Sequence, residues 1–83
     1  MTRVTAVKAL ESYCLWVRFR DGVEGSIDLS PLIGKGVFQP LADPAEFAKV
    51  FVDPITQTVA WPNGIDLCPD TLYEDIKAKQ QAA

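Results

Sequence analysis

The strongest constraint on the fold is an alternation of apolar and polar residues from Tyr13 to Leu29, broken only at Asp21-Gly22. A period of two is typical of a strand that buries one face, and Asp-Gly between two such runs is a turn signal. The segment therefore predicts a β-hairpin with strands over residues 13–20 and 23–29.

The same alternation selects the register of this hairpin. A two-residue loop would place Phe19 opposite Glu24, which pairs an apolar side chain with a charged one. A three-residue loop instead places Phe19 opposite Val23 and Arg18 opposite Glu24, so that the pairs match in polarity. It also needs a left-handed residue at the last loop position, where Gly22 stands. We therefore expect the three-residue loop.

Shorter alternating runs predict the other strands. Residues 3–10 form the first, with Val4 and Ala6 on one side and Val7 and Ala9 on the other. Two further strands are expected over residues 50–53 and 57–61, joined by a turn that contains Asp53-Pro54.

Capping signals predict the helices. A short helical turn is expected after Ser30, and a second short helix after Asp43, with Pro44 as its first residue. Pro69 opens a last helix, for which Thr71 and Glu74 are spaced as a capping box, and the chain from Lys77 onward is expected to fray.

These elements predict a single domain over residues 1–83 of the α+β class. The expected architecture is an antiparallel sheet of about five strands, with short crossover helices and the C-terminal helix packed on one face. The core expected between the sheet and this helix consists of Leu15, Val17, Phe19, Ile27, Val52, Val59, Leu72 and Ile76.

Composition narrows the chemistry. The chain has no histidine, the commonest general base and transition-metal ligand, and its carboxylates match no calcium-loop spacing. Its two cysteines, Cys14 and Cys68, are too few for a zinc site and are expected to be reduced and mostly buried. We therefore expect no metal, no cofactor, no catalytic residue and no enzymatic activity.

Charge and hydropathy narrow the partners and the location. The net charge of −3 argues against direct binding to nucleic acid or to anionic lipid. The N-terminus lacks the apolar stretch of a signal peptide, and no run of apolar residues is long enough for a membrane span. A cytoplasmic location is expected.

Two segments carry candidate contact residues. Trp16, Arg18 and Arg20 share one side of a strand and could stack on single-stranded nucleic acid, but a tryptophan under the C-terminal helix or at a protein interface is the preferred interpretation. The turn around Trp61 and Asn63 is explained by Asn-Gly turn chemistry, with an exposed tryptophan as anchor for a partner as the alternative.

Several motifs together resemble the short bacterial domain-of-unknown-function family DUF2442, whose fold is that of the NE0471 N-terminal domain. The matching pieces cover nearly the whole chain in order; they are Arg18-Phe19-Arg20-Asp21-Gly22, Asp28-Leu29-Ser30-Pro31-Leu32, Gly36-Val37-Phe38 with Leu41, Phe47, Val52-Asp53, Trp61-Pro62-Asn63-Gly64-Ile65-Asp66-Leu67, and Pro69 with Leu72-Tyr73. The resemblance carries no catalytic residues. In the family that it resembles, some members continue into a helix-turn-helix domain, and some are encoded beside a second small gene in a pairing that suggests a toxin–antitoxin cassette. The resemblance therefore implies a small protein partner.

The leading hypothesis is a non-enzymatic protein-interaction module, antitoxin-like or regulatory, that binds another small protein and forms a homodimer. Trp16, Arg18, Trp61 and Asn63 are its candidate contact residues. The first alternative is a transcription-associated protein that works with a DNA-binding partner. The second is a small-molecule binder or small enzyme.

Overall fold

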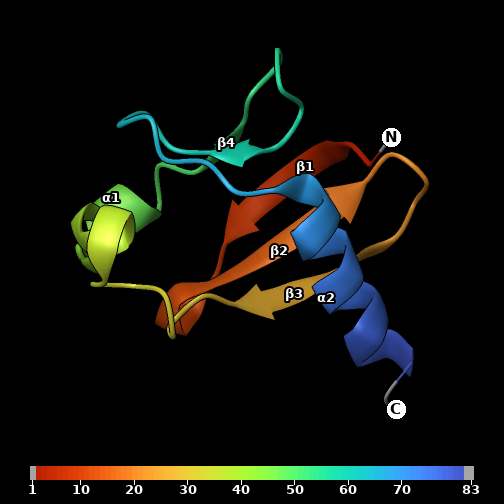
Figure 1. The fold of residues 1–83 in the computed structure, drawn as a ribbon, viewed down its shortest axis with the longest axis horizontal. Helices are drawn as coiled ribbons and strands as arrows, with labels where there is room; N and C mark the ends of the chain where they lie inside the picture. Colours follow the sequence, from red (N-terminus) through yellow and green to blue (C-terminus); the bar gives the residue numbers. More distant parts are fainter. Residues whose placement is uncertain (1, 82–83) are drawn as a thin grey trace.

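The hairpin predicted from the alternation lies at the centre of the fold in the computed structural model, which describes residues 2–81. Its strands are β2 (Cys14–Phe19) and β3 (Glu24–Asp28), shown in Figure 1. They pair in the expected register, with Leu15 opposite Ile27 and Arg18 opposite Glu24. Gly22 takes a positive φ of 91° in the three-residue loop, which confirms the role predicted for it.

The described residues contain five antiparallel strands in two sheets, which confirms the α+β class and divides the expected single sheet. The larger sheet has the order β1-β2-β3, with β1 at Val4–Ala9. The smaller sheet pairs β4 (Phe51–Val52) with β5 (Val59–Ala60). Figure 1 shows β4 beside β1, and the Val4 amide donates to the carbonyl of Gln57 at 2.9 Å, so the smaller sheet continues past the β1 edge.

A β-bulge in β1 overturns the faces expected for this strand. Val4 lies opposite Phe19, but the next paired residue is Ala6 opposite Arg18, so the alternation slips by one residue between them. The buried Val4 and the half-buried Val7 can therefore both serve the core, although strict alternation separated them.

Helix α2 (Pro69–Gln81) covers one face of the larger sheet and packs mainly on β3 (Figure 1). It begins at Pro69 as predicted, but Thr71 lies inside it and cannot be its N-cap, so the expected capping box does not form. The helix also continues through residues 77–81, where fraying was expected, while residues 82–83 of that expectation lie outside the described residues. Gly25 permits the close approach, because a Cβ there would lie 2.8 Å from Cγ2 of Ile76.

The crossover between the sheets is helical. Asp43 caps α1 (Pro44–Phe47) by accepting a hydrogen bond from the Ala45 amide at 2.9 Å, as its position predicts. The 3-10 helix Gly36–Ala42 ahead of it was not predicted, and a tight turn at Glu11–Tyr13, in which Ser12 and Tyr13 take positive φ, joins β1 to β2.

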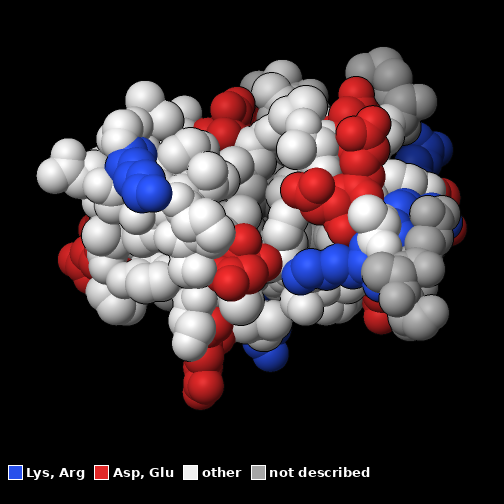
Figure 2. Space-filling model, turned by 60° about the horizontal axis from the view of Figure 1, so that its bottom comes forward, with Lys and Arg blue, Asp and Glu red and all other residues white. Residues whose placement is uncertain are grey.

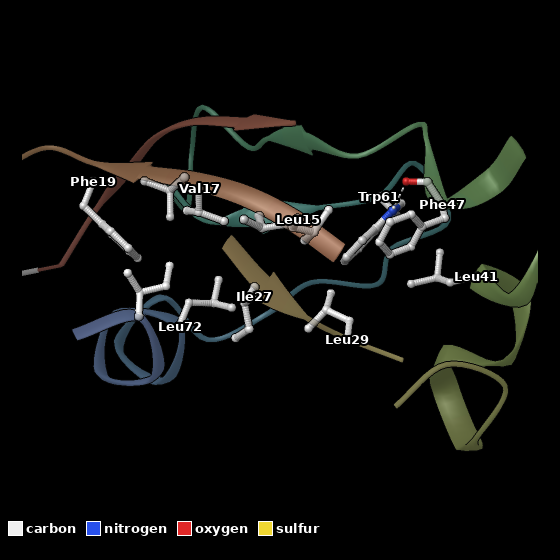
Figure 3. Packing of buried hydrophobic residues seen from close by; sticks show 12 residues of the cluster. Leu15, Val17, Phe19, Ile27, Leu29, Leu41, Phe47, Trp61 and Leu72 are labelled. Carbon is white, nitrogen blue, oxygen red and sulfur yellow. Dashed lines mark hydrogen bonds between the residues drawn. The ribbon is translucent and has the colours of Figure 1, made fainter. Parts of the chain in front are cut away.

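The core lies between the larger sheet, α2 and the crossover (Figure 3). Of the eight core residues expected, Val52 is half-buried and the others are buried. The cluster extends further toward α1 than expected, because it also buries Val4, Leu29, Leu41, Phe47 and Trp61. None of the helices in the described part of the chain is both long and apolar enough to span a membrane.

Candidate interaction surface

The larger sheet has one covered face and one face turned away from the core. Leu15 and Val17 point inward and are fully buried. Because side chains alternate along a strand, Trp16 and Arg18 point outward. We call this second side the outer face, and it is formed by Ala6, Lys8, Trp16, Arg18, Glu24 and Ser26.

Trp16 stands at the middle of the outer face. It lies on the central strand, with Lys8 opposite it on β1 and Ser26 opposite it on β3. Its side chain is half-buried. Because α2 packs on the other side of the sheet, the expectation that this tryptophan lies under the C-terminal helix is wrong.

Arg18 lies one row away and forms an ion pair across the hairpin. Its Nε lies 3.1 Å from Oε2 of Glu24, and the two side chains are 55% and 47% exposed. An exposed pair of this kind contributes about 0.2–1 kcal/mol to stability, as a cross-strand contact. The charge of Arg18 is thus partly balanced within the chain.

Trp61 is buried, which overturns the exposed aromatic anchor considered for the turn that follows it. Its side chain is 2% exposed, and its indole N–H donates to the carbonyl of Phe47 at 2.9 Å (Figure 3). The two rings lie 5.9 Å apart between centroids. The run Val59-Ala60-Trp61 is buried throughout, and this continuous apolar run is the sequence signal that favoured burial.

Asn63 is exposed at the turn after β5 and has a local structural role. Its Oδ1 accepts a hydrogen bond from the Ile65 amide at 3.2 Å, while the Gly64 amide donates to the carbonyl of Trp61 at 3.0 Å. Gly64 takes a φ of 94°, as the Asn-Gly turn requires. Of the four candidates, the structure therefore brings Trp16 and Arg18 together and places Asn63 in a separate loop.

Sequence reasoning missed a polar contact between the hairpin turn and α2. The Tyr73 hydroxyl donates to Oδ2 of Asp21 at 2.6 Å, and its ring meets Phe19 edge-on at 5.0 Å between centroids. This bond lowers the pKa of the Asp21 carboxyl and raises the pKa of Tyr73, and a second bond, from the Val23 amide, further lowers the pKa of Asp21. Fifty-two positions separate the two residues, so no local pattern could link them.

An open cleft of about 490 Å³ lies around this contact. Its wall carries positively and negatively charged side chains. The lining residues are Thr2, Arg3, Phe19, Arg20, Asp21, Pro69, Asp70 and Tyr73. Among the residues that the structure describes, no three histidine, cysteine, aspartate or glutamate side chains gather as a metal site would require.

Both cysteines are free thiols, and their burial differs from the expectation. Cys14 is half-buried, whereas Cys68 is exposed just ahead of α2. Hydrogen bonds from the amide and hydroxyl of Thr71 and from the amide of Asp70 lower the pKa of the Cys68 thiol. The amides of Asp70 and Thr71 lie in the first turn of α2, where backbone amides have no partner within the helix. The Cys68 sulfur thus takes the place that the side chain of a capping residue usually has.

Comparison with known proteins identifies the family. Residues 4–78 match the family described as "Protein of unknown function (DUF2442)". The chain belongs to the DUF2442 family. No curated protein matches it.

A solved structure also resembles this DUF2442 chain. It is the crystal structure named "Putative DNA Binding Protein NE0471 from Nitrosomonas europaea ATCC 19718", with 28% sequence identity and a TM-score of 0.67. The match covers 76% of this chain and 41% of the NE0471 chain, so the DUF2442 chain spans less than half of that protein.

Proposed function

We propose that this DUF2442 chain is a non-enzymatic protein-interaction module that binds another small protein through the outer face of its larger sheet. The observation that supports this most directly is Trp16, a half-buried tryptophan at the centre of a face that α2 leaves uncovered. A tryptophan that gains full burial on binding is a strong anchor, because its ring contributes a large apolar area at low entropic cost.

The charged groups around Trp16 would form the polar rim of an interface centred on this tryptophan. Lys8 lies directly across on β1, and the ion pair of Arg18 with Glu24 lies in the next row. Interfaces between proteins commonly have an aromatic centre and a charged border that orients the partner. The proposed biological role is antitoxin-like or regulatory, and the proposed assembly includes a homodimer.

The experiment is affinity capture from the native host, followed by the native mass of the eluted complex. We expect a stoichiometric second protein with the wild-type chain and its loss with Trp16→Ala. Phe51→Ala is the matched control, because Phe51 is also a partly exposed aromatic strand residue, 40% exposed, but lies on the smaller sheet. Retention of the partner by a folded Trp16→Ala variant would exclude the outer face as the contact surface.

A second candidate function is a role in transcription, in which the chain acts together with a DNA-binding partner. It is favoured by the name printed for NE0471, "Putative DNA Binding Protein", of which this chain matches 41%. In a mobility-shift assay, we expect the isolated chain to leave duplex DNA unshifted, since its net charge is −3, and the captured complex to shift it in a salt-dependent manner. A DNA shift by the isolated chain would replace this view with direct binding.

A further inference from the structure

The open edge of β3 offers backbone groups to a further strand. In the β2–β3 pair, the Phe19 amide donates to the Val23 carbonyl at 2.7 Å, and the Leu29 amide donates to the Tyr13 carbonyl at 2.9 Å. Hydrogen-bonded pairs alternate along an antiparallel ladder. The backbone groups of Ser26 and Asp28 are therefore directed away from β2, toward the side on which no described strand lies.

A contact from α2 confirms this direction. The Lys79 ammonium donates to the Ser26 carbonyl at 3.3 Å, which it can do only because this carbonyl points out of the sheet. The opposite edge of the sheet differs, because Val4 on β1 is already bonded to Gln57. The β3 edge beside Ser26 is thus available for a strand to add to it.

A groove runs beside this edge, between β3 and one side of α2. It encloses about 550 Å³, and Thr71, Asp75 and Lys79, spaced one helical turn apart, line its helical wall. Its β3 side is lined by Asp28 and by the apolar residues Ile27, Leu29, Pro31 and Leu32. Side chains of an added strand that point toward the α2 side would enter this groove, as alternate residues do in strand addition.

The charges along the edge select the occupant. Glu24 and Asp28 flank Ser26 on the outer side, and Asp75 faces the groove from α2. The cations nearby are Arg18, which is paired with Glu24, and Lys79, which already lies at the edge. Figure 2 brings the lower side of the molecule forward and shows acidic side chains gathered around a basic one.

A second copy of the chain does not suit this edge. Antiparallel pairing of two β3 strands about Ser26 would place Glu24 of each copy opposite Asp28 of the other. Like charges directly opposite each other destabilise a strand pair. A strand with basic residues four positions apart would instead place a cation beside each carboxylate.

We propose that the β3 edge binds a basic extended peptide segment as an additional antiparallel strand, with lysine or arginine opposite Glu24 and Asp28 and apolar residues between them directed into the groove. This inference rests on the proposed function, since it names a class of partner for an interaction module. A backbone amide of the incoming strand replaces the Lys79 ammonium as the donor to the Ser26 carbonyl. Lys79 is then free to pair with Asp75, one turn earlier on α2.

The probe is a capped seven-residue peptide with the order glycine, lysine, valine, threonine, valine, lysine, glycine. We expect it to bind about tenfold more tightly than the same peptide with glutamate for lysine. Binding should slow amide hydrogen exchange at Ser26 and Asp28, measured by NMR spectroscopy. Equal binding of the two peptides, or unchanged exchange at both amides, would overturn the proposal, and so would the absence of binding at millimolar peptide.

Ser26→Pro blocks the edge without touching the hairpin, because the Ser26 amide points away from β2 and proline is tolerated at such edge positions. We expect it to weaken the lysine peptide about tenfold or more, while Ser26→Ala, which keeps the amide, binds as the wild type does.

If Ser26→Pro does not fold, Asp28→Asn replaces it as the test. This substitution removes a charge and keeps the side-chain oxygen that accepts the Ser30 amide, and it should weaken the lysine peptide about threefold. Unchanged affinity in either folded variant contradicts the edge site. If the captured partner of the proposed function still binds a folded Ser26→Pro variant, the edge inference fails while the interaction module stands. If the wild-type chain itself captures no partner, the interaction module fails.

Discussion

The two faces of the larger sheet show how differently one strand can use neighbouring residues. On the inner face, Leu15, Val17 and Phe19 are almost completely buried, and Gly25 lets α2 approach. On the outer face, Trp16 keeps part of its ring exposed among charged neighbours. The inner face therefore determines stability, while the outer face can change with little cost to the fold.

The two tryptophans give the largest contrast. Trp61→Ala should lower the free energy of unfolding by about 3–5 kcal/mol, because it empties a buried site and removes the shorter of the two hydrogen bonds to the Phe47 carbonyl, the other coming from the Val50 amide at 3.4 Å. Trp16→Ala should cost less, about 1–2 kcal/mol, because its side chain is only half-buried. Urea denaturation of both variants checks this, and similar costs would contradict the division between the faces.

Gly25 and Ser26 give the next contrast, between adjacent positions on opposite faces. Gly25→Ala should cost about 1–3 kcal/mol, because its Cβ would lie 2.8 Å from Cγ2 of Ile76. Ser26→Ala on the outer face should stay within about 0.5 kcal/mol of the wild type. Ile76→Ala removes the clash, so the double variant with Gly25→Ala should be less destabilised than the sum of the two single changes.

Tyr73 lies at the rim between the faces and gives a pH-dependent effect. Its bond lowers the pKa of Asp21, so the stabilisation is present above the ordinary aspartate pKa and is lost as the pH falls through the lowered value. Tyr73→Phe should therefore flatten the fall in thermal midpoint on acidification.

Tyr13→Phe is the control for that measurement. The Tyr13 hydroxyl donates to the backbone carbonyl of Ala42, which does not titrate, so its loss should shift the midpoint equally at each acidic pH. An acid dependence that Tyr73→Phe leaves unaltered would place the titrating group elsewhere.

The smallest effect is expected from the outer-face ion pair. A double-mutant cycle of Arg18→Ala and Glu24→Ala should give a coupling of about 0.2–1 kcal/mol in low salt and less in high salt. A larger coupling that resists salt would mean that the outer face contributes to stability as the inner face does.

The sequence predicted the parts of the fold that local chemistry determines. The hairpin register, the Asp43 cap and the start of α2 all follow from residues close together in the chain. The bulge in β1 and the division into two sheets depend on how distant strands meet, so the alternation could not show them.

The candidate site divides in the same way. Alternation correctly grouped Trp16 with Arg18, because both lie on one strand. It did not show that Trp61 is buried; the continuous apolar run Val59-Ala60-Trp61 was the signal for that, while the bond to the Phe47 carbonyl, fourteen residues away, had no signal in the sequence. Alternation could not predict the Tyr73–Asp21 contact either, because the two residues are far apart in the sequence.

The acidic residues that flank Ser26 also bear on aggregation. An open strand edge is a template on which sheets can grow without limit, and proteins commonly protect such edges with charge. Here the repulsion between Glu24 and Asp28 of neighbouring copies discourages that growth. The amide and hydroxyl of Ser30 hold the pKa of the Asp28 carboxyl below its usual value, so this residue keeps its charge in mildly acidic solution. The same two carboxylates that favour a basic partner thus help to keep the chain from forming fibrils.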